Sequence, residues 1–555
     1  LAIELAAARV RDLTIEQIAD RLDNRLQLLT GGSKTALTRR QTMRASIDWS
    51  CQLLAEPERE FLRMVPIFSG GWTLSAAETI SRSDYALDRL SALRDASLVI
   101  SQPAGTSIRY RLLETVREYV LELLSDAERE RLERLHAEYY LELAEQGESH
   151  SSRQDEQQWC EYLDADHDNL RVAFDFWISR GDGSRALRMA GALSWFWYVR
   201  GYAREGRQRV ALALRAGADA PAAIRARAIT GGATLAICQG DMAAGRRLHE
   251  ESLTLFREIG DAAGIARALN GAGMIAWREG DYAGAEGFYQ EALNALNLHE
   301  DPWPIAFTMS LLGSVRGELG DGNGARALLE ESLAMMRAQQ EQRGIAHAAQ
   351  TLGQFLNRTG NPNAGRVLIA ESLTIRKALN HVPGIAGSMV DLGMSHFMVN
   401  EVEAAREQWR EAVRIFRELD DHYGAADALY YLALAALAEH DLPQARMLLT
   451  ESFDMNPIWA DRRTSPERVD AVAHLAYAEG RCETAVRLIS CAAALRKSMN
   501  TVAGERSRDD RILADLKARV REPQFSRLWQ DGLDLDVAEA ARYARQSDAG
   551  SAWPS

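Results

Sequence analysis

The chain has 555 residues, with 65 Lys and Arg against 79 Asp and Glu, so its formal net charge is −14 at pH 7. Hydrophobic residues make up 46% of it and charged residues 26%, a balance typical of folded globular proteins and not of disordered or collagen-like chains. The length exceeds what one compact core holds, which predicts several domains or an extended repeat array. No uncharged apolar run approaches the roughly 18 residues that cross a bilayer, and no leader pattern follows Leu1, so we expect neither a membrane protein nor a secreted one.

Cysteine usage and overall acidity narrow the class further. The five cysteines are scattered and form no CxxC pair, so neither a disulfide framework nor a zinc site is indicated, and a cytoplasmic location is expected. The negative net charge argues against binding of nucleic acid over the whole protein surface, although it is compatible with a local basic patch.

The first 145 residues contain short helices and one hairpin. Residues 1–10 read as a helix with no start signal, as though the chain continued from something longer. Short helices are predicted near residues 56–64 and 74–80. Alternating segments at 98–101 and 107–112 flank a Gln-Pro-Ala-Gly turn, which indicates a β-hairpin. Helices followed by a hairpin favour a winged-helix-like domain.

The segment between this domain and the regular repeats predicts irregular helical pairs over residues 157–216. Near its start, four residues could suggest a metal site: Asp164, Asp166, His167 and Asp168. On a helix, however, side chains one or two residues apart face different directions, so solvated capping or a salt-bridged surface is the favoured interpretation.

A forty-residue repeat organises the second half of the chain. Turn signals recur at that interval, at Gly240-Asp241, Gly280-Asp281, Gly320-Asp321, Gly360-Asn361, Asn400-Glu401, His440-Asp441 and Gly480-Arg481. Small residues hold a fixed register around them, and large residues follow in the second half of each unit, at Tyr289, Leu329, Ile369, Trp409 and Leu449. Each unit therefore predicts two amphipathic antiparallel helices, and successive hairpins must stack because one alone cannot bury its apolar face. The spacing resembles tetratricopeptide repeats.

That resemblance implies a ligand groove lined by first-helix residues that packing does not use. The groove residues carried over by register are Arg267, Asn270, Met274, Trp277, Phe307, Ser310, His347, Gln350, Gln354, Asn357, Met394, Phe397, Asp427 and Tyr430. Amides interleaved with aromatic residues suit a peptide or protein segment, or a polar small molecule. The alternative for any one residue is simple solvation, and for Met274 and Phe397 it is core packing.

Three stretches also resemble signal-transduction ATPases with numerous domains (STAND) of the bacterial LuxR, AfsR and cyclase-linked type. LAIELAAAR at the start resembles the tail of their NB-ARC-like module, and IDWSCQLLAEPEREFLRMVPIFSGGWTLSAAE and YRLLETVREYVLELL resemble the winged helix that follows it. The resemblance implies a nucleotide switch in an upstream P-loop domain, a winged helix that closes over the nucleotide, and repeats that sense a trigger.

The sequence departs from that family in two places. No GxxxxGK[ST] occurs, and Gly31-Gly32-Ser33-Lys34-Thr35 lacks the glycine spacing of a phosphate loop, so a solvated turn is favoured there. The family's MHD motif would fall on Leu112-Leu113-Glu114, where Leu113 replaces the histidine that contacts phosphate. Only Glu114 matches in chemical type, and it is the one candidate cofactor-binding residue.

A basic stretch lies just before the winged-helix region. Between residues 24 and 47 the chain has no acidic residue and five basic ones: Arg25, Lys34, Arg39, Arg40 and Arg44. It could contact DNA phosphates. An interdomain surface resting on the ATPase domain is favoured instead, because the stretch lacks a clear recognition helix and the resemblance places the winged helix internally.

Together these features predict a mainly α protein, with a winged-helix-like N-terminal domain followed by an α-solenoid of tetratricopeptide-like hairpins. The expected divisions are 1–30 (tail of the NB-ARC-like subdomain), 31–125 (winged helix), 126–221 (irregular helical repeats), 222–500 (seven repeats) and 501–555 (helical cap and tail). The expected role is the sensor part of a STAND-type regulator. It would bind a protein, a peptide or a small effector in the groove and control an upstream ATPase.

We expect no enzyme, no metal and no cofactor in this chain, since ATP or ADP would need the upstream domain. We also expect no membrane partner and no DNA contact through this part. The alternatives left open are a freestanding tetratricopeptide scaffold and a DNA-binding regulator that uses the winged-helix segment.

Overall fold

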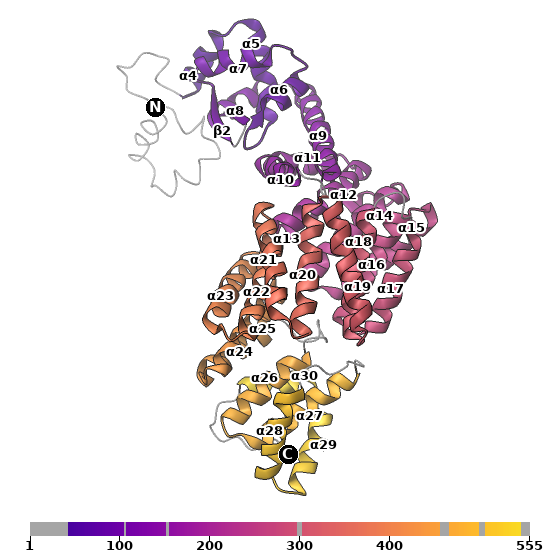
Figure 1. Cartoon of the computed structure of the whole chain (residues 1–555). Helices are drawn as coiled ribbons and strands as arrows, with labels where there is room; N and C mark the ends of the chain where they lie inside the picture. The colour runs from indigo at the N-terminus through magenta and orange to yellow at the C-terminus, as the bar shows by residue number, and fades with distance from the viewer. Residues whose placement is uncertain are drawn as a thin grey trace, which may run out of the picture. The chain divides into compact units, whose positions relative to one another are not determined.

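The computed structural model describes residues 43–104, 107–150, 155–296, 302–455, 465–498 and 506–545 (Figure 1). The chain divides into two compact units: residues 1–146 with 161–189, and residues 147–160 with 190–555. The predicted NB-ARC-like tail (1–30), the Gly31–Thr35 turn and the basic stretch up to Thr42 lie outside the described residues. Among the helices that are described, none is long and apolar enough to span a membrane.

The first unit contains helices around a three-stranded antiparallel sheet with strand order β1-β3-β2. The elements up to the start of the second unit are, in chain order, α4 (Met43–Gln52), α5 (Glu56–Met64), a 3-10 turn (Val65–Ile67), β1 (Trp72–Thr73), α6 (Leu74–Ser81), α7 (Ala86–Asp95), β2 (Val99–Ala104), β3 (Ser107–Leu112), α8 (Glu114–Glu122), α9 (Asp126–Ser149), α10 (Glu156–Ala165), α11 (His167–Ser179) and α12 (Gly183–Arg200). The division between the units falls within α9, α10 and α12, so residues 147–160 and the part of α12 from residue 190 belong to the second unit. The hairpin β2–β3 pairs Val99 with Leu112, and β1 joins it through Trp72 opposite Tyr110. The described elements include the predicted hairpin, preceded by helices and the short strand β1. The winged-helix assignment itself stays a prediction.

A buried polar network in this unit corrects one interpretation of the sequence. Asp166, expected at a solvated surface, is only 4% exposed. Its Oδ1 accepts hydrogen bonds from Arg109 Nη2 at 2.9 Å, Tyr140 Oη at 3.1 Å and Asn169 Nδ2 at 2.9 Å. Asn169 also donates to the Gly71 carbonyl. Asp168 does follow the expectation, since it is exposed and pairs with Arg171 one helical turn away.

The second unit is built from helical hairpins in the predicted forty-residue register. After α13 (Ala203–Ala216) they run α14 (Ala222–Cys238), α15 (Met242–Ile259), α16 (Ala262–Arg278), α17 (Tyr282–Ala295), α18 (Pro302–Glu318), α19 (Gly322–Ala338), α20 (Gln342–Arg358), α21 (Pro362–Ala378), α22 (Val382–Met398), α23 (Val402–Glu418), α24 (His422–Ala438), α25 (Leu442–Met455), α26 (Ser465–Ala478) and α27 (Cys482–Ser498). The helices α28 (Arg506–Arg519), α29 (Gln524–Leu533) and α30 (Val537–Arg545) follow them. From α14 to α24, successive first helices begin forty residues apart.

The turns explain why each helix stops and the next one starts. Gly240, Gly280 and Gly320 end their helices at positive φ angles of 77°, 77° and 91°, which glycine adopts without strain. The aspartate that follows each glycine then caps the next helix, as Asp321 does by accepting a hydrogen bond from the Gly324 amide at 2.9 Å.

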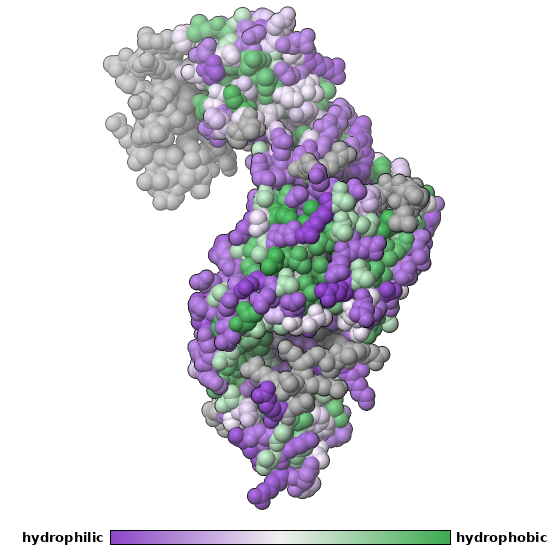
Figure 2. Space-filling model, in the orientation of Figure 1, coloured by the Kyte–Doolittle hydropathy of each residue, from purple (hydrophilic) through white to green (hydrophobic). Residues whose placement is uncertain are grey.

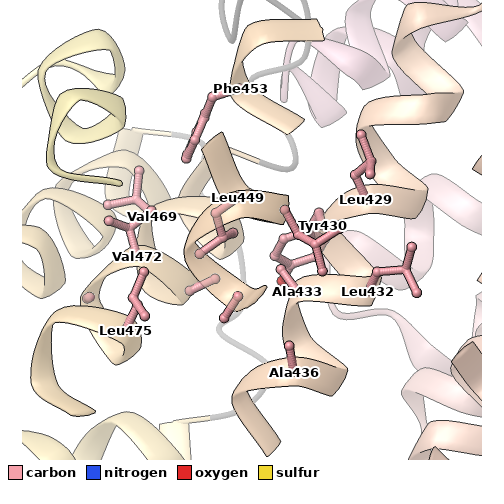
Figure 3. Close-up of a cluster of buried hydrophobic side chains, with 14 of the residues drawn as sticks. Leu429, Tyr430, Leu432, Ala433, Ala436, Leu449, Phe453, Val469, Val472 and Leu475 are labelled. Atoms are coloured by element: carbon pink, nitrogen blue, oxygen red, sulfur yellow. The ribbon is translucent and has the colours of Figure 1, made fainter. Parts of the chain in front are cut away.

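The packing inside each hairpin pairs a small residue with a large one, as the sequence predicts. A Cβ built on Gly273 would lie 2.5 Å from the Tyr289 ring. Equivalent placements are 2.9 Å for Gly313 and Leu329, and 2.7 Å for Gly353 and Ile369. The small residue therefore makes room for the large one. Figure 3 shows the same layer in α24–α26, where Ala433 and Leu449 lie in one buried cluster with Val472.

Ion pairs on the surface link the second helices of neighbouring repeats at every other step, from α15 to α17, from α19 to α21 and from α23 to α25. An arginine near the end of one helix meets a glutamate in the next, in Arg257–Glu291, Arg337–Glu371 and Arg417–Glu451. The members are 34 residues apart in each pair, and successive pairs are shifted by eighty residues. We call these pairs the outer ladder.

Candidate functional site

An aromatic cluster on α18 and α20 is the most distinctive feature of the predicted groove. Trp303 and Phe307 stack with ring centroids 5.2 Å apart, and the His347 ring lies 4.8 Å from Phe307. The Arg343 guanidinium lies 5.6 Å from the centroid of the Trp303 ring. We call these four residues the aromatic cluster.

Local sequence explains how the aromatic cluster forms. Trp303 and Phe307, like Arg343 and His347, are four residues apart on one helix, so each pair shares a face. Of the four, the sequence analysis identified Phe307 and His347. Trp303 and Arg343 were missed, although extending the same face by one turn toward the helix start would have found them.

Burial keeps His347 uncharged. Burial, together with smaller contributions from the nearby Arg376 and Arg343, lowers the pKa of this histidine from its ordinary value of 6.5 to about 3. The His347 ring nitrogen Nε2 lies 3.0 Å from the Ser310 hydroxyl, another predicted groove residue. At neutral pH the aromatic cluster therefore carries positive charge only on Arg343.

Polar residues of neighbouring repeats meet beside this cluster. Gln350 and Gln354 both donate to Asp391 Oδ2, the latter at 2.8 Å. Asn357 Nδ2 donates to Ser395 Oγ at 2.9 Å. Asp391, which the sequence analysis missed, orients two of the predicted amides. We call the side of the first helices that carries these amides and the aromatic cluster the inner face.

Other predicted groove residues lie elsewhere or belong to packing. Asn270 is buried and donates to Thr308 Oγ1 at 2.8 Å. Trp277 and Phe397 are partly buried against hydrophobic clusters, Phe397 with its ring centroid 5.7 Å from that of Trp409. Tyr430 is 8% exposed.

The remaining predicted site residues are exposed, ion-paired or packed against hydrophobic clusters. Arg267 is exposed, and Asp427 pairs with Arg468. Met274 and Met394 pack against hydrophobic clusters. In the first unit, Glu114 is exposed in the first turn of α8, with its carboxylate 3.2 Å from Arg117. Its role toward a nucleotide stays a prediction.

Within the second unit, the helices curve far enough for distant repeats to touch. Arg200 Nη1 donates to the carbonyl of Asn380, 180 residues away, at 3.0 Å. The Tyr198 ring lies 5.3 Å from His381, and the Arg278 guanidinium lies 4.4 Å from the Tyr423 ring centroid. These residues stand at helix ends beside the turns, so the forty-residue pattern gave no signal for them.

A buried arginine lies near these contacts. Arg376 is 8% exposed and donates through Nη1 to the Gly384 carbonyl at 2.7 Å and to Ser388 Oγ at 3.1 Å. Burial lowers the pKa of His381 well below its usual range, with Arg376, Arg343 and Arg200 acting in the same direction.

In the view of Figure 2, apolar side chains gather near α18 and α20 and are interrupted by polar residues. In the ranges that the structure describes, no three His, Cys, Asp or Glu side chains group to hold a metal ion.

Comparison with known proteins agrees with this architecture. Residues 226–297 and residues 385–419 match two models of the tetratricopeptide repeat family. These are tetratricopeptide repeats.

Two curated relatives come from Mycobacterium tuberculosis. A protein named "Putative HTH-type transcriptional regulator" is 37% identical over 284 residues, which cover 48% of this chain and 31% of the relative. An uncharacterized protein is 37% identical over 133 residues, covering 23% of this chain and 34% of the relative. The chain thus spans about a third of the length of the curated relatives that it matches.

Two solved structures resemble the chain at low sequence identity. A STAND protein with a tetratricopeptide repeat sensor from Pyrococcus horikoshii aligns with a TM-score of 0.46 and 16% identity, over 96% of this chain and 73% of that one. A Rap protein complexed with competence and sporulation factor aligns with a TM-score of 0.45 and 13% identity, over 65% of this chain and 96% of that one.

Proposed function

We propose that this chain is the sensor part of a STAND-type signal-transduction regulator. Its inner face binds a protein or peptide segment, or a small effector, and occupancy of that face controls an ATPase switch in an upstream domain. The observation that carries the proposal is the aromatic cluster lying on the same inner face as the amides around Asp391.

The chemistry of the inner face suits a peptide. Stacked aromatic rings offer a large apolar contact at low entropic cost, and an arginine beside them supplies charge and hydrogen-bond donors. Gln350 and Gln354 present amides that hydrogen-bond to main-chain groups of either polarity. Because both amides are oriented by Asp391, little order has to be gained when a ligand binds.

A relative's name supports a regulatory role. The mycobacterial protein that is 37% identical over 284 residues is named as a regulator of transcription, and the matched part is only 31% of its length. The sensing part of such a regulator needs to bind a ligand and to transmit the binding signal to the rest of the protein, and it needs no catalytic residues. The chain's own motif for nucleotide is limited to Glu114, so we assign ATP or ADP to the upstream domain.

Selection of peptides tests the binding role directly. A displayed library of random peptides is selected against the full chain, and the affinity of the best peptide is measured by fluorescence anisotropy. Phe307→Ala and His347→Ala should each weaken binding by about ten-fold or more, the size expected for aromatic anchor residues. Val367→Ala, which truncates an exposed apolar side chain on the second helix α21, is the matched control and should leave affinity unchanged. Recovery of no peptide, or equal effects of all three substitutions, would contradict the proposal.

Addition of nucleotide tests whether ATP binds to this chain or only to the upstream domain. Titration of this chain with ATP and Mg²⁺ should give no saturable binding and no hydrolysis. Saturable binding at micromolar ATP would show that the chain holds a nucleotide site of its own, and Glu114→Ala would then identify whether it lies at the start of α8.

A further inference from the structure

The turn that leads into α22 differs from the equivalent turns of other repeats at two positions. In three other repeats the residue that begins the first helix is acidic, and its carboxylate accepts a hydrogen bond from the amide of the glycine three residues later. An apolar side chain near the end of the preceding second helix packs against the same glycine. The acidic residues are Asp261, Glu341 and Asp421, and the apolar ones are Phe256, Met336 and Phe416.

Both positions carry nitrogen-containing side chains at α22. His381 replaces the acidic residue and Arg376 replaces the apolar one, since each is separated from its equivalents by multiples of forty. They meet at the same glycine, because a Cβ built on Gly384 would lie 2.8 Å from His381 Nδ1 and 3.0 Å from Arg376 Nε. This turn therefore has two groups that can donate hydrogen bonds where the other three have a carboxylate and an apolar side chain.

The buried charge of Arg376 has no counterion within the chain. Its Nη1 donates to two uncharged oxygen atoms, the Gly384 carbonyl and Ser388 Oγ. In the part of the chain that the structure describes, Arg376 forms no ion pair, whereas Arg343 nearby pairs with Glu156. Burial accordingly lowers the pKa of Arg376. Taking a guanidinium out of water is costly unless an anion compensates its charge, so this position favours a bound anion.

His381 adds unsatisfied hydrogen-bonding groups at the same place. It is 5% exposed, and among the described residues neither of its ring nitrogens has a hydrogen-bond partner. Burial lowers the pKa of His381 well below its usual range, so the ring is neutral and one nitrogen carries a hydrogen to donate. The His381 side chain also does not cap α22, so the Gly384 amide lacks the carboxylate that the equivalent amides have. Buried polar groups are normally hydrogen-bonded, and these three share the need for an acceptor.

Arg376 connects this turn with the inner face. Gly387, three residues further along α22, is partly exposed, and a Cβ built on it would lie 3.8 Å from Gln350 Nε2 and 3.9 Å from Arg376 Nη1. Asp391 acts on Arg376 only through its charge, and it accepts hydrogen bonds from Gln350 and Gln354. The guanidinium and the Gln350 amide therefore face one position of α22 that has no side chain.

We propose that Arg376, His381 and the first turn of α22 bind a small carboxylic acid. Its carboxylate takes the place that an acidic side chain holds in the three other repeats, and it accepts hydrogen bonds from the Arg376 guanidinium, the His381 ring and the Gly384 amide. One carboxylate balances the one uncompensated charge, and the burial of both side chains requires a small molecule. The site shares no residue with the aromatic cluster. The inference rests on the proposed function for the consequence of binding, and it gives the small effector a chemical class.

Calorimetric titration of the full chain tests the ligand class. The probes are acetate, lactate and benzoate, each compared with its uncharged amide. At least one of the acids should bind saturably, and its amide should bind about ten-fold more weakly or worse because it lacks the charge-assisted hydrogen bonds. Inorganic phosphate is the probe for a different anion. Saturable binding of phosphate and of none of the acids would overturn the inference.

The test variant combines Arg376→Met with His381→Glu, which reproduces the pair Met336 and Glu341 at the turn between α19 and α20. Because that pair packs in its own repeat, the variant should fold, and it should bind the acid about ten-fold more weakly or worse. The matched control combines Lys377→Met with His422→Glu, which makes the same changes of charge at exposed side chains and should leave acid binding unchanged. Thermal unfolding is the second readout, because the acid should stabilise the unmodified chain and the control but not the test variant.

Two results would contradict the site. Saturable binding of none of the probes is one, and equal acid binding by the test variant and the control is the other. The library peptides separate this inference from the proposed function. If peptides bind in a manner that depends on Phe307 while no acid binds, peptide sensing stands and the carboxylate site is wrong. If an acid binds the unmodified chain and not the test variant while no peptide is recovered, the carboxylate site stands and peptide recognition is contradicted.

Discussion

The contact between Gly393 and Trp409 offers a sharp test of how each hairpin packs. Trp409 is fully buried, and its indole Nε1 donates to the Val390 carbonyl at 3.0 Å. A Cβ added at Gly393 would lie 2.7 Å from Cδ1 of that ring, well inside normal contact, and the ring is buried in the hydrophobic core. Gly393→Ala should therefore destabilise the array by about 1–3 kcal/mol through overpacking, reduced by the ~1 kcal/mol that alanine gains over glycine in a helix.

A double-mutant cycle isolates this contact. Trp409→Leu alone should cost about 2–4 kcal/mol because it leaves a cavity. In that background, however, Gly393→Ala should become neutral or stabilising by ~1 kcal/mol, since the pair then matches Ala433 and Leu449 of the next repeat. Gly287→Ala is the control: a Cβ there would meet nothing within 4 Å, so stability should rise by ~1 kcal/mol.

Urea unfolding followed by circular dichroism measures these changes, with hydrogen exchange of α22 and α23 peptides as the local readout. Local exchange is needed because repeat arrays do not unfold as one two-state unit. The same free-energy change for Gly393→Ala in both backgrounds would refute the view that the large residue in the second helix requires the small one in the first.

Three further changes test other parts of the structure. Asp166→Ala should destabilise the first unit by about 3–5 kcal/mol because it leaves Arg109 without its buried partner. The control, Asp168→Ala, removes an exposed ion pair and should cost less than ~1 kcal/mol. Thermal unfolding compares the two variants, and similar losses of stability would contradict the buried network. Asp321→Ala should cost about 1 kcal/mol and speed amide exchange at the start of α19, because it removes the cap on Gly324. Burial lowers the pKa of His136 from 6.5 to about 4, so between these pH values the unfolded chain takes up a proton that the folded chain does not. The free energy of unfolding should fall by up to ~3 kcal/mol as the pH drops through this window, and urea titrations should find a smaller drop for His136→Gln.

The repeat array could be predicted in detail because its determinants are local and recur. A helix-ending glycine such as Gly280, a capping aspartate after it, and the small residue that faces Tyr289 all follow one period. Each therefore carries its own signal in the sequence. The hairpin of the winged-helix-like domain was predicted for the same reason, while the two-residue strand β1 was too short to give a pattern.

The rest of the site depends on contacts that no local pattern encodes. Arg200 meets Asn380 only because the helices curve through several repeats, and small angles at every turn determine that curvature. Asp166 was interpreted as a surface residue because side chains one or two residues apart on a helix face different directions and so do not form a metal site. Its burial depends on Arg109, 57 residues earlier, which supplies the compensating charge. The pairing of Glu156 with Arg343 is likewise a tertiary event across 187 residues.

The outer ladder bears on how such arrays change length. Each of its arginines finds its glutamate in the following unit, and the same two residue types recur at the same places two units later. Excising or duplicating a pair of units, eighty residues in all, would therefore join an outer-ladder arginine to an equivalent glutamate. The outer ladder by itself would thus survive a change of array length in steps of eighty residues.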